Sequence, residues 1–215
     1  MKKILSLALI GFVLASCGGS SENADSQQQE LDPNLITCES IGKVRLSYSH
    51  EDLETEFGAD NLEDGTEEID GKEVNITKVF PGTAEEVVVA WTEDSAPFSK
   101  AAKLSVSDEM GPYQLEEGIR VGSTIKELVQ ANNFLPVTFT NFYAREDGFA
   151  YIQSFNDGDL AQKYPCLGGV LDIDRTDNLE TSLLEEFKLE NPAKSNHKAM
   201  NFIYANVVEL SISAE

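Results

Sequence analysis

The sequence predicts an α+β protein made of two repeated units, each a helix packed on an antiparallel β-sheet. First, residues 42–53 and 118–128 align without a gap once Val44 is placed on Ile119. Second, a hairpin signal follows each segment, and third, residues 104–109 and 210–215 begin with the same alternating pattern. Matching landmarks in the same order are the signature of an internal repeat.

The composition allows a packed core but disfavours several kinds of partner. The chain has 215 residues, 41% of them hydrophobic, and 16 Lys+Arg against 38 Asp+Glu give a formal charge of −22. That apolar content separates it from a disordered acidic tail. Nucleic acid is not expected as a partner, because phosphate binding needs clustered Lys and Arg.

The first element along the chain is a signal peptide, predicted over residues 1–16. Lys2 and Lys3 form a charged start, and Ile4–Val13 is an apolar stretch too short to span a bilayer. Residues Leu14-Ala15-Ser16-Cys17 are similar to a bacterial lipobox. This resemblance implies cleavage before Cys17, a diacylglyceryl group on its sulfur and an acyl chain on its amine. A plain secretory signal with a chance cysteine is the alternative.

The lipobox resemblance implies anchoring in a membrane by two or three acyl chains, where one chain would be marginal. No other run approaches the roughly 20 apolar residues of a transmembrane helix. Gly18 is not the Asp that retains such lipoproteins in the inner membrane, so the outer membrane is expected, on its periplasmic face or at the cell surface. Residues 17–36 are rich in Ser, Gln and acids and are predicted to be a flexible tether.

Two cysteines remain once Cys17 is assigned to lipid. Cys38 and Cys166 are an even pair in an oxidising compartment, and a disulfide between them is the first interpretation. Two unrelated buried thiols are the alternative. Neither cysteine has a second Cys or a His at ligand spacing, so no metal is expected there.

Unit 1 is predicted over residues 37–112. A short strand at 44–47 leads into a helix that Ser49 and Asp52 cap, and that helix places Leu53 and Phe57 on one face. The Asp70-Gly71 dipeptide is a hairpin signal. The remaining strands are expected at 74–80, 86–92 and 103–107.

Unit 2 is predicted over residues 113–215 with the same plan. A strand at 119–122 leads into a helix capped by Thr124 and Glu127, with Ile125, Leu128 and Val129 on its buried face. Asp147-Gly148 is the second hairpin signal. Strands are expected at 137–143, 149–155 and 207–213. Residues 176–201 form an insertion, predicted to be a long loop with a short helix near 179–187.

The turn that leads into the second helix carries a family resemblance. Gly122–Leu128, with an eroded copy at Ser47–Leu53 that lacks the glycine, resembles the modules of outer-membrane assembly lipoproteins of the SmpA/OmlA type. It also resembles the tandem modules of β-lactamase inhibitory protein, and the run Gly118–Leu128 is similar to one in uncharacterised bacterial lipoproteins. The resemblance implies protein–protein contact rather than catalysis, and it transfers no site residue.

Acidic residues are concentrated in unit 1, where eleven lie between Glu51 and Glu73 and only Lys72 opposes them. A calcium site, a steering patch for a basic partner and a solvated face are the three interpretations. The spacing of an EF-hand is absent, which favours the solvated face. Asp172, Asp174 and Asp177 are weak metal candidates for the same reason, and no cofactor is expected.

Aromatic residues are concentrated in unit 2, with seven between residues 134 and 155. The strands there are predicted to carry apolar side chains on both faces, and one helix covers only one face. The second face must be covered by something else: the other unit, the insertion, a partner protein or a sugar ring. Phe142, Tyr143 and Tyr151 are the candidate binding surface.

Catalysis has little support in the sequence. His50 and His197 are both expected to be exposed, and no His-Glu-x-x-His, Gly-x-Ser-x-Gly or P-loop occurs. The sequence therefore predicts a lipid-anchored cell-envelope lipoprotein that is a non-catalytic protein-binding module. A surface carbohydrate- or calcium-binding lipoprotein is the alternative, and a hydrolase using scattered carboxylates is a weaker one.

Overall fold

The computed structural model of the protein describes residues 32–69 and 72–214. The predicted signal peptide, Cys17, the tether up to residue 31 and the Asp70-Gly71 hairpin signal lie outside the described residues. Among the residues that are described, no helix has the length and apolar character needed to cross a bilayer.

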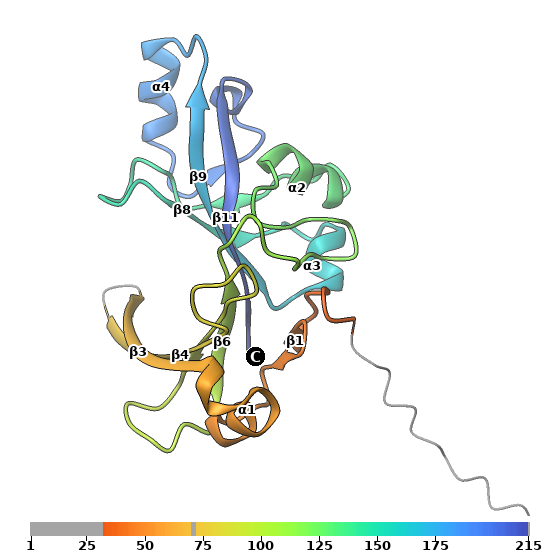
Figure 1. Ribbon diagram of the computed structural model, residues 1–215. Helices are drawn as coiled ribbons and strands as arrows, with labels where there is room; N and C mark the ends of the chain where they lie inside the picture. Colours follow the sequence, from red (N-terminus) through yellow and green to blue (C-terminus); the bar gives the residue numbers. More distant parts are fainter. Residues whose placement is uncertain (1–31, 70–71, 215) are drawn as a thin grey trace, which may run out of the picture. The chain divides into compact units, whose positions relative to one another are not determined.

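One antiparallel sheet dominates the described part of the chain, with strand order β10-β7-β8-β9-β11-β6-β5-β4-β3 (Figure 1). Its strands are β3 (Leu62–Ile69), β4 (Lys72–Val79), β5 (Val87–Trp91), β6 (Ala101–Val106), β7 (Thr138–Phe139), β8 (Ala150–Ser154), β9 (Leu167–Thr176), β10 (Ala193–Lys194) and β11 (Ile203–Ser213). A small separate sheet pairs β1 (Ser40–Ile41) with β2 (Val44–Arg45). The predicted α+β class, a large antiparallel sheet with few helices, is confirmed.

Short helices accompany the sheet. They are α1 (His50–Phe57), α2 (Ile125–Ala131), α3 (Asp159–Lys163) and α4 (Thr181–Lys188), with the 3-10 turns η1 (Ala59–Asn61) and η2 (Lys198–Asn201). Ser49 and Thr124 are the N-caps of α1 and α2, and each takes part in a full capping box, as predicted. The short helix predicted in the insertion is α4.

The core lies between α1, α2 and one face of the sheet. Residues directly paired across an antiparallel ladder share a face, and the pairs Val89↔Leu104 and Leu104↔Ile212 put these three side chains on the core face. Leu53 of α1 and Leu128 of α2 are fully buried in the same cluster. One hydrophobic core therefore serves both helices.

Three predicted strands are shorter than expected or absent. The strand at 44–47 is reduced to β2, and no strand forms at 119–122. There Gly122 turns the chain with a positive φ of 89°, and its N–H donates to the Val207 carbonyl at 2.8 Å. The strand predicted at 137–143 stops at Phe139, and the backbone N–H of Asn141 donates to Asn191 Oδ1 at 3.1 Å rather than to a neighbouring strand.

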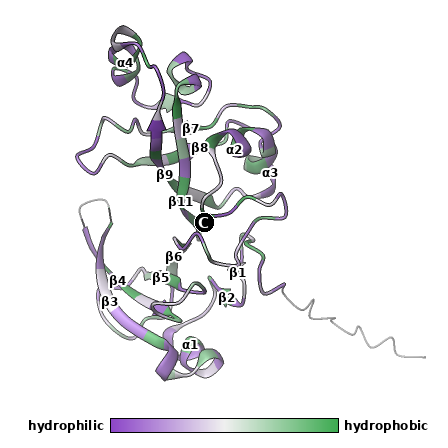
Figure 2. Ribbon diagram, turned by 45° about the horizontal axis from the view of Figure 1, so that its top comes forward, coloured by the Kyte–Doolittle hydropathy of each residue, from purple (hydrophilic) through white to green (hydrophobic). Residues whose placement is uncertain are grey.

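Four strands were not predicted, the two-residue β1 and β10 and the longer β3 and β9. β3 is part of the acidic segment and lies at the edge of the sheet, with purple stretches in Figure 2. Charged residues are depleted in strands but protect exposed edges from unwanted pairing. β9 contains Gly168 and Gly169, which weaken a strand pattern. A Cβ on Gly169 would stand 2.7 Å from the Glu209 carbonyl oxygen, so the close approach of β11 requires the glycine.

The folded part begins inside the predicted tether 17–36. The Ile36 side chain is 1% exposed, and its N–H donates to the Gln114 carbonyl at 2.8 Å. The Leu35 carbonyl accepts from the Gly42 N–H at 2.8 Å. These contacts place the boundary of the packed structure before residue 37.

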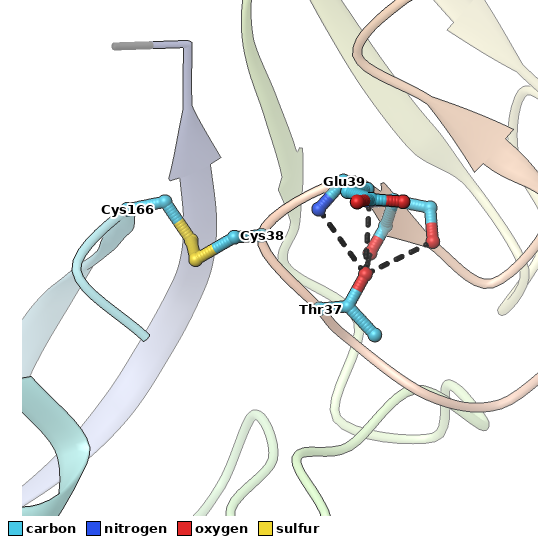
Figure 3. The surroundings of a disulfide bond; sticks show 5 residues. Thr37, Cys38, Glu39 and Cys166 are labelled. Atoms are coloured by element: carbon cyan, nitrogen blue, oxygen red, sulfur yellow. Dashed lines mark hydrogen bonds between the residues drawn. A yellow bond between two sulfur atoms is a disulfide. The ribbon is translucent and has the colours of Figure 1, made fainter. Parts of the chain in front are cut away.

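The predicted disulfide is confirmed: Cys38 and Cys166 are bonded, across 128 residues of sequence. Figure 3 shows the turn that presents Cys38, in which the Thr37 hydroxyl accepts from the N–H groups of Glu39 and Ser40 at 3.2 and 3.1 Å. Cys166 directly precedes β9. The bond therefore ties the first folded residues to a central strand of the sheet.

Candidate binding groove

A groove with a volume of about 550 Å³ lies on the second face of the sheet, opposite the core. In Figure 1, β3 and the connection that precedes β8 lie to the left of β11, and α2 lies to its right. The residues at the groove lining are Glu67, Glu68 and Ile69 of β3, Lys103 of β6 and Ser107 directly after it, Arg145, Asp147 and Phe149 of the β7–β8 connection, Tyr151 of β8, Val170 and Asp172 of β9, and Val208 and Glu209 of β11. The floor is thus regular sheet, and the walls come from distant parts of the sequence.

A β-bulge in β11 shapes the floor. Val207 pairs with Leu171 and Glu209 pairs with Val170, so Val208 is the extra residue between them. Strict alternation would turn only one of two neighbouring side chains toward the groove. A bulge re-aims a side chain, and as a result both Val208 and Glu209 line the groove.

An ion pair crosses the floor between β6 and β11. Lys103 Nζ donates to Glu209 Oε1 at 2.8 Å, and each side chain keeps 26% of its surface exposed. A pair at this exposure adds little to the free energy of unfolding. Its effect on the groove is to neutralise both charges.

The opposite wall is held by a second ionic contact. The guanidinium of Arg145 lies 4.6 Å from the centre of the Tyr151 ring and 3.0 Å from Asp147 Oδ2. The Phe149 N–H donates to Asp147 Oδ1 at 3.0 Å and, together with Arg145, keeps the pKa of the Asp147 carboxyl below its usual range. Asp147 is therefore ionised at neutral pH and fixes this wall.

The predicted binding surface of Phe142, Tyr143 and Tyr151 is divided by the structure. Tyr151 lines the groove. Phe142 is only 2% exposed and packs on Phe139 in the core, so it forms no surface. Tyr143 is 41% exposed but lies outside the groove, with its ring edge-on to Phe187. The strand predicted at 137–143 ends before these residues, which is why the expected common face is not formed.

The sequence interpretation did not identify Lys103, Val208 and Glu209 as groove residues. The sequence contains one indication: Lys103 and Glu209 directly precede Leu104 and Leu210, the first residues of the two matching closing segments. The bulge that exposes Val208 left no recognisable sequence pattern.

The weak metal candidates do not gather into a site. Asp172 Oδ1 accepts from the N–H of Ile173, while Asp174 and Asp177 face Arg175 at 3.5 and 3.4 Å. Within residues 32–69 and 72–214, no three His, Cys, Asp or Glu side chains are placed to hold a metal ion together.

His50 lies in a different cavity, and its side chain is 22% exposed, less than predicted. Its Nε2 is 3.0 Å from Asp64 Oδ1, which also accepts from the Thr77 hydroxyl at 2.7 Å. Thr77 in turn accepts from Trp91 Nε1 at 2.9 Å. This chain of hydrogen bonds joins α1 to β3, β4 and β5.

The two serine hydroxyls of the His50 cavity are bonded to carboxylates, Ser49 to Asp52 at 2.7 Å and Ser99 to Glu93 at 2.6 Å. A nucleophilic serine needs a hydrogen bond to its base, and neither hydroxyl makes one to the imidazole. His197 is also more buried than predicted, with 10% exposure, and its Nδ1 accepts from the Ala199 N–H. Both histidines have structural roles.

No protein-family model and no curated protein matches the sequence. Among solved structures, the chain is similar to the crystal structure of the uncharacterized protein yfeY from Escherichia coli, with 11% sequence identity and a TM-score of 0.48. The alignment covers 84% of this chain and 100% of that chain.

Proposed function

We propose that the protein is a lipid-anchored lipoprotein of the bacterial outer membrane that binds another protein, without catalysis, through the groove. The groove itself is the observation that carries the proposal. Its floor is four strands of one sheet, and its lining combines aromatic rings, aliphatic side chains and ion pairs. A rigid, mixed surface of this kind binds without the entropic cost of ordering loops.

We also propose that the chain is a tandem duplication of helix-on-sheet units, 37–112 and 113–215. Four strands follow α1, namely β3 to β6, and β7, β8, β9 and β11 follow α2 in the same neighbour order. The final strands of the two series, β6 and β11, are antiparallel neighbours. Two copies joined by their last strands would form a sheet with the same strand order on both sides of its centre.

The register of β6 and β11 supports the duplication further. Ser105 stands opposite Ser211, and these are the residues that the two closing segments equate in sequence. Leu104 faces Ile212 and Val106 faces Leu210, so exchanging the equivalent residues of the two segments turns one pair into the other. A two-fold axis between Ser105 and Ser211 requires this register.

The resemblance to assembly lipoproteins and to β-lactamase inhibitory protein supports protein binding, since both use such modules for contact with other proteins. A carbohydrate ligand would stack on an aromatic ring face. Arg145 already lies over the Tyr151 ring, 4.6 Å from its centre, which leaves a sugar less ring surface. We therefore place the sugar-binding alternative second.

Binding is tested by photo-crosslinking in the native host. A photoreactive phenylalanine analogue at Val208 or Tyr151 should give a discrete crosslinked partner that mass spectrometry identifies. The control position is Phe134, which is 75% exposed and does not line the groove. Adducts from Phe134 alone, or none from the groove positions, would refute the proposal.

Anchoring is tested by metabolic labelling with an alkyne fatty acid. The wild type should carry the label and fractionate with outer membranes, whereas Cys17→Ala should do neither. Cys17→Ala leaves every described residue unchanged, so we expect the variant to fold like the wild type. An unlabelled wild type would contradict the lipobox interpretation.

A further inference from the structure

We infer that the segment docked in the groove is basic, a stretch of the partner protein that carries Lys or Arg side chains to Glu67 and Asp172. This inference rests on the proposed function, because it names the chemistry of the partner that the groove would bind.

The charges of the groove are unequally satisfied. Neighbouring residues of a regular strand face opposite sides, and the register puts Glu67 and Ile69 on the same face as Lys103, so the Glu68 carboxylate is turned away from the groove. Four other carboxylates and two cations belong to the lining. Lys103 is paired with Glu209 at 2.8 Å, and Arg145 is paired with Asp147 at 3.0 Å. Two carboxylates, those of Glu67 and Asp172, remain in excess over the cations.

These remaining carboxylates select the occupant by charge. Glu67 is exposed and Asp172 is half-buried, so water solvates both carboxylates in the free protein. A neutral or acidic segment would remove that water and leave buried charges without partners, which is strongly unfavourable. A basic segment replaces the water with ion pairs and avoids the penalty.

The apolar part of the lining fits the same occupant. Ile69, Phe149, Val170 and Val208 lie between and beside the charged groups. Lys and Arg side chains have aliphatic stems that pack on apolar surface while the charged head reaches a carboxylate. The groove volume of about 550 Å³ accommodates a few such side chains, which indicates an extended segment or loop rather than a flat surface.

The charge of the whole molecule favours the same partner. The formal charge of −22 attracts cationic segments from a distance and raises their association rate. Long-range attraction does not depend on where an acid lies, whereas docking does. The test must therefore separate groove carboxylates from acids elsewhere.

The experiment compares two double variants with the same charge change. E67Q/D172N removes the excess carboxylates of the groove, and E51Q/E56Q removes two exposed acids of α1 that do not line it. The full-length lipoprotein in non-ionic detergent is titrated against fluorescein-labelled octalysine, and binding is followed by fluorescence anisotropy. Thermal unfolding of both variants checks that they fold.

We expect the groove variant to weaken octalysine binding by about fourfold, since two partly exposed contacts of about twofold each multiply to this value. The control variant should change binding by less than about twofold, because it alters only long-range attraction. Equal losses in the two variants would overturn the inference. If the groove variant fails to fold, E67Q alone is compared with E51Q.

A second measurement separates this inference from the proposed function. The Val208 crosslinker is placed in the E67Q/D172N protein, and the yield of the partner adduct is compared with that of the unchanged groove. A fall in yield supports the basic segment. An unchanged yield leaves protein binding intact and refutes the basic segment, whereas no adduct in either protein refutes the proposed function itself.

Discussion

Removal of the Cys38–Cys166 bond should lower the free energy of unfolding without altering the folded state. The bond closes a loop with a sequence separation of 128 residues. In the chain-entropy description, a loop of this length restricts the unfolded chain by about 5 kcal/mol. β9 keeps its ladder to β11 from Leu167 to Thr176 whether or not the bond is present. The change therefore acts mainly on the unfolded state.

The variant C38S/C166S is unfolded with urea and followed by the fluorescence of Trp91. That residue is the single tryptophan and is 2% exposed, so its emission reports loss of the core. With a denaturant slope of about 2.5 kcal/mol/M, a loss of 5 kcal/mol moves the midpoint by about 2 M. The wild type treated with a reductant should show the same midpoint.

Two results would refute this reasoning. A midpoint shift below about 0.4 M, or about 1 kcal/mol, would mean that the unfolded chain is already restricted by residual structure. A far-UV circular dichroism spectrum that changes on reduction without urea would mean that the bond holds β9 in the native sheet.

Three further predictions concern the core, the insertion and pH. Leu128→Ala should cost about 3 kcal/mol in urea unfolding because Leu128 is fully buried, whereas Leu189→Ala, at 87% exposure, should cost almost nothing. Asn141→Ala removes hydrogen bonds of 2.7 and 2.8 Å to the carbonyls at the end of α4, so hydrogen exchange should accelerate in α4 while β11 is unchanged. Hydrogen bonds, first that of the Ser99 hydroxyl and then those of the Ser99 N–H and the Thr92 hydroxyl, lower the pKa of Glu93 from 4.5 to about 2, so this stabilisation is present above pH 4.5 and is lost as the pH falls through about 2. Ser99→Ala should raise the Glu93 pKa in an NMR titration, and an unchanged value would contradict the assignment.

Local signals in the sequence predicted the helices well. The caps Ser49 and Thr124 and the apolar spacing of α1 and α2 act within a few residues, and the structure contains both helices where they were expected. The apolar strands β4, β5, β6 and β11 followed from alternation. The disulfide followed from counting cysteines, because only one pairing was left.

The elements that were missed depend on their neighbours in the sheet rather than on their own sequence pattern. β3 contains Glu67 and Glu68, which have low strand propensity, and it forms because it pairs with β4 at the edge of the sheet. Gly169 weakens the strand pattern in the sequence, yet in the structure it allows β11 to approach β9 closely. The groove shares this property, since Glu67, Arg145 and Glu209 meet only through the order of the strands.

The duplication that we propose gives a physical reason for the asymmetry of the groove. Lys103 and Glu209 are counterparts in the two closing segments, and they meet at 2.8 Å beside the axis between Ser105 and Ser211. Two identical units would place like charges at this point, where they repel, so opposite charges require that the copies have diverged. The same divergence extends to the walls, which are acidic at β3 and aromatic at the β7–β8 connection. A partner that binds across the axis therefore meets two different surfaces and can dock in only one orientation.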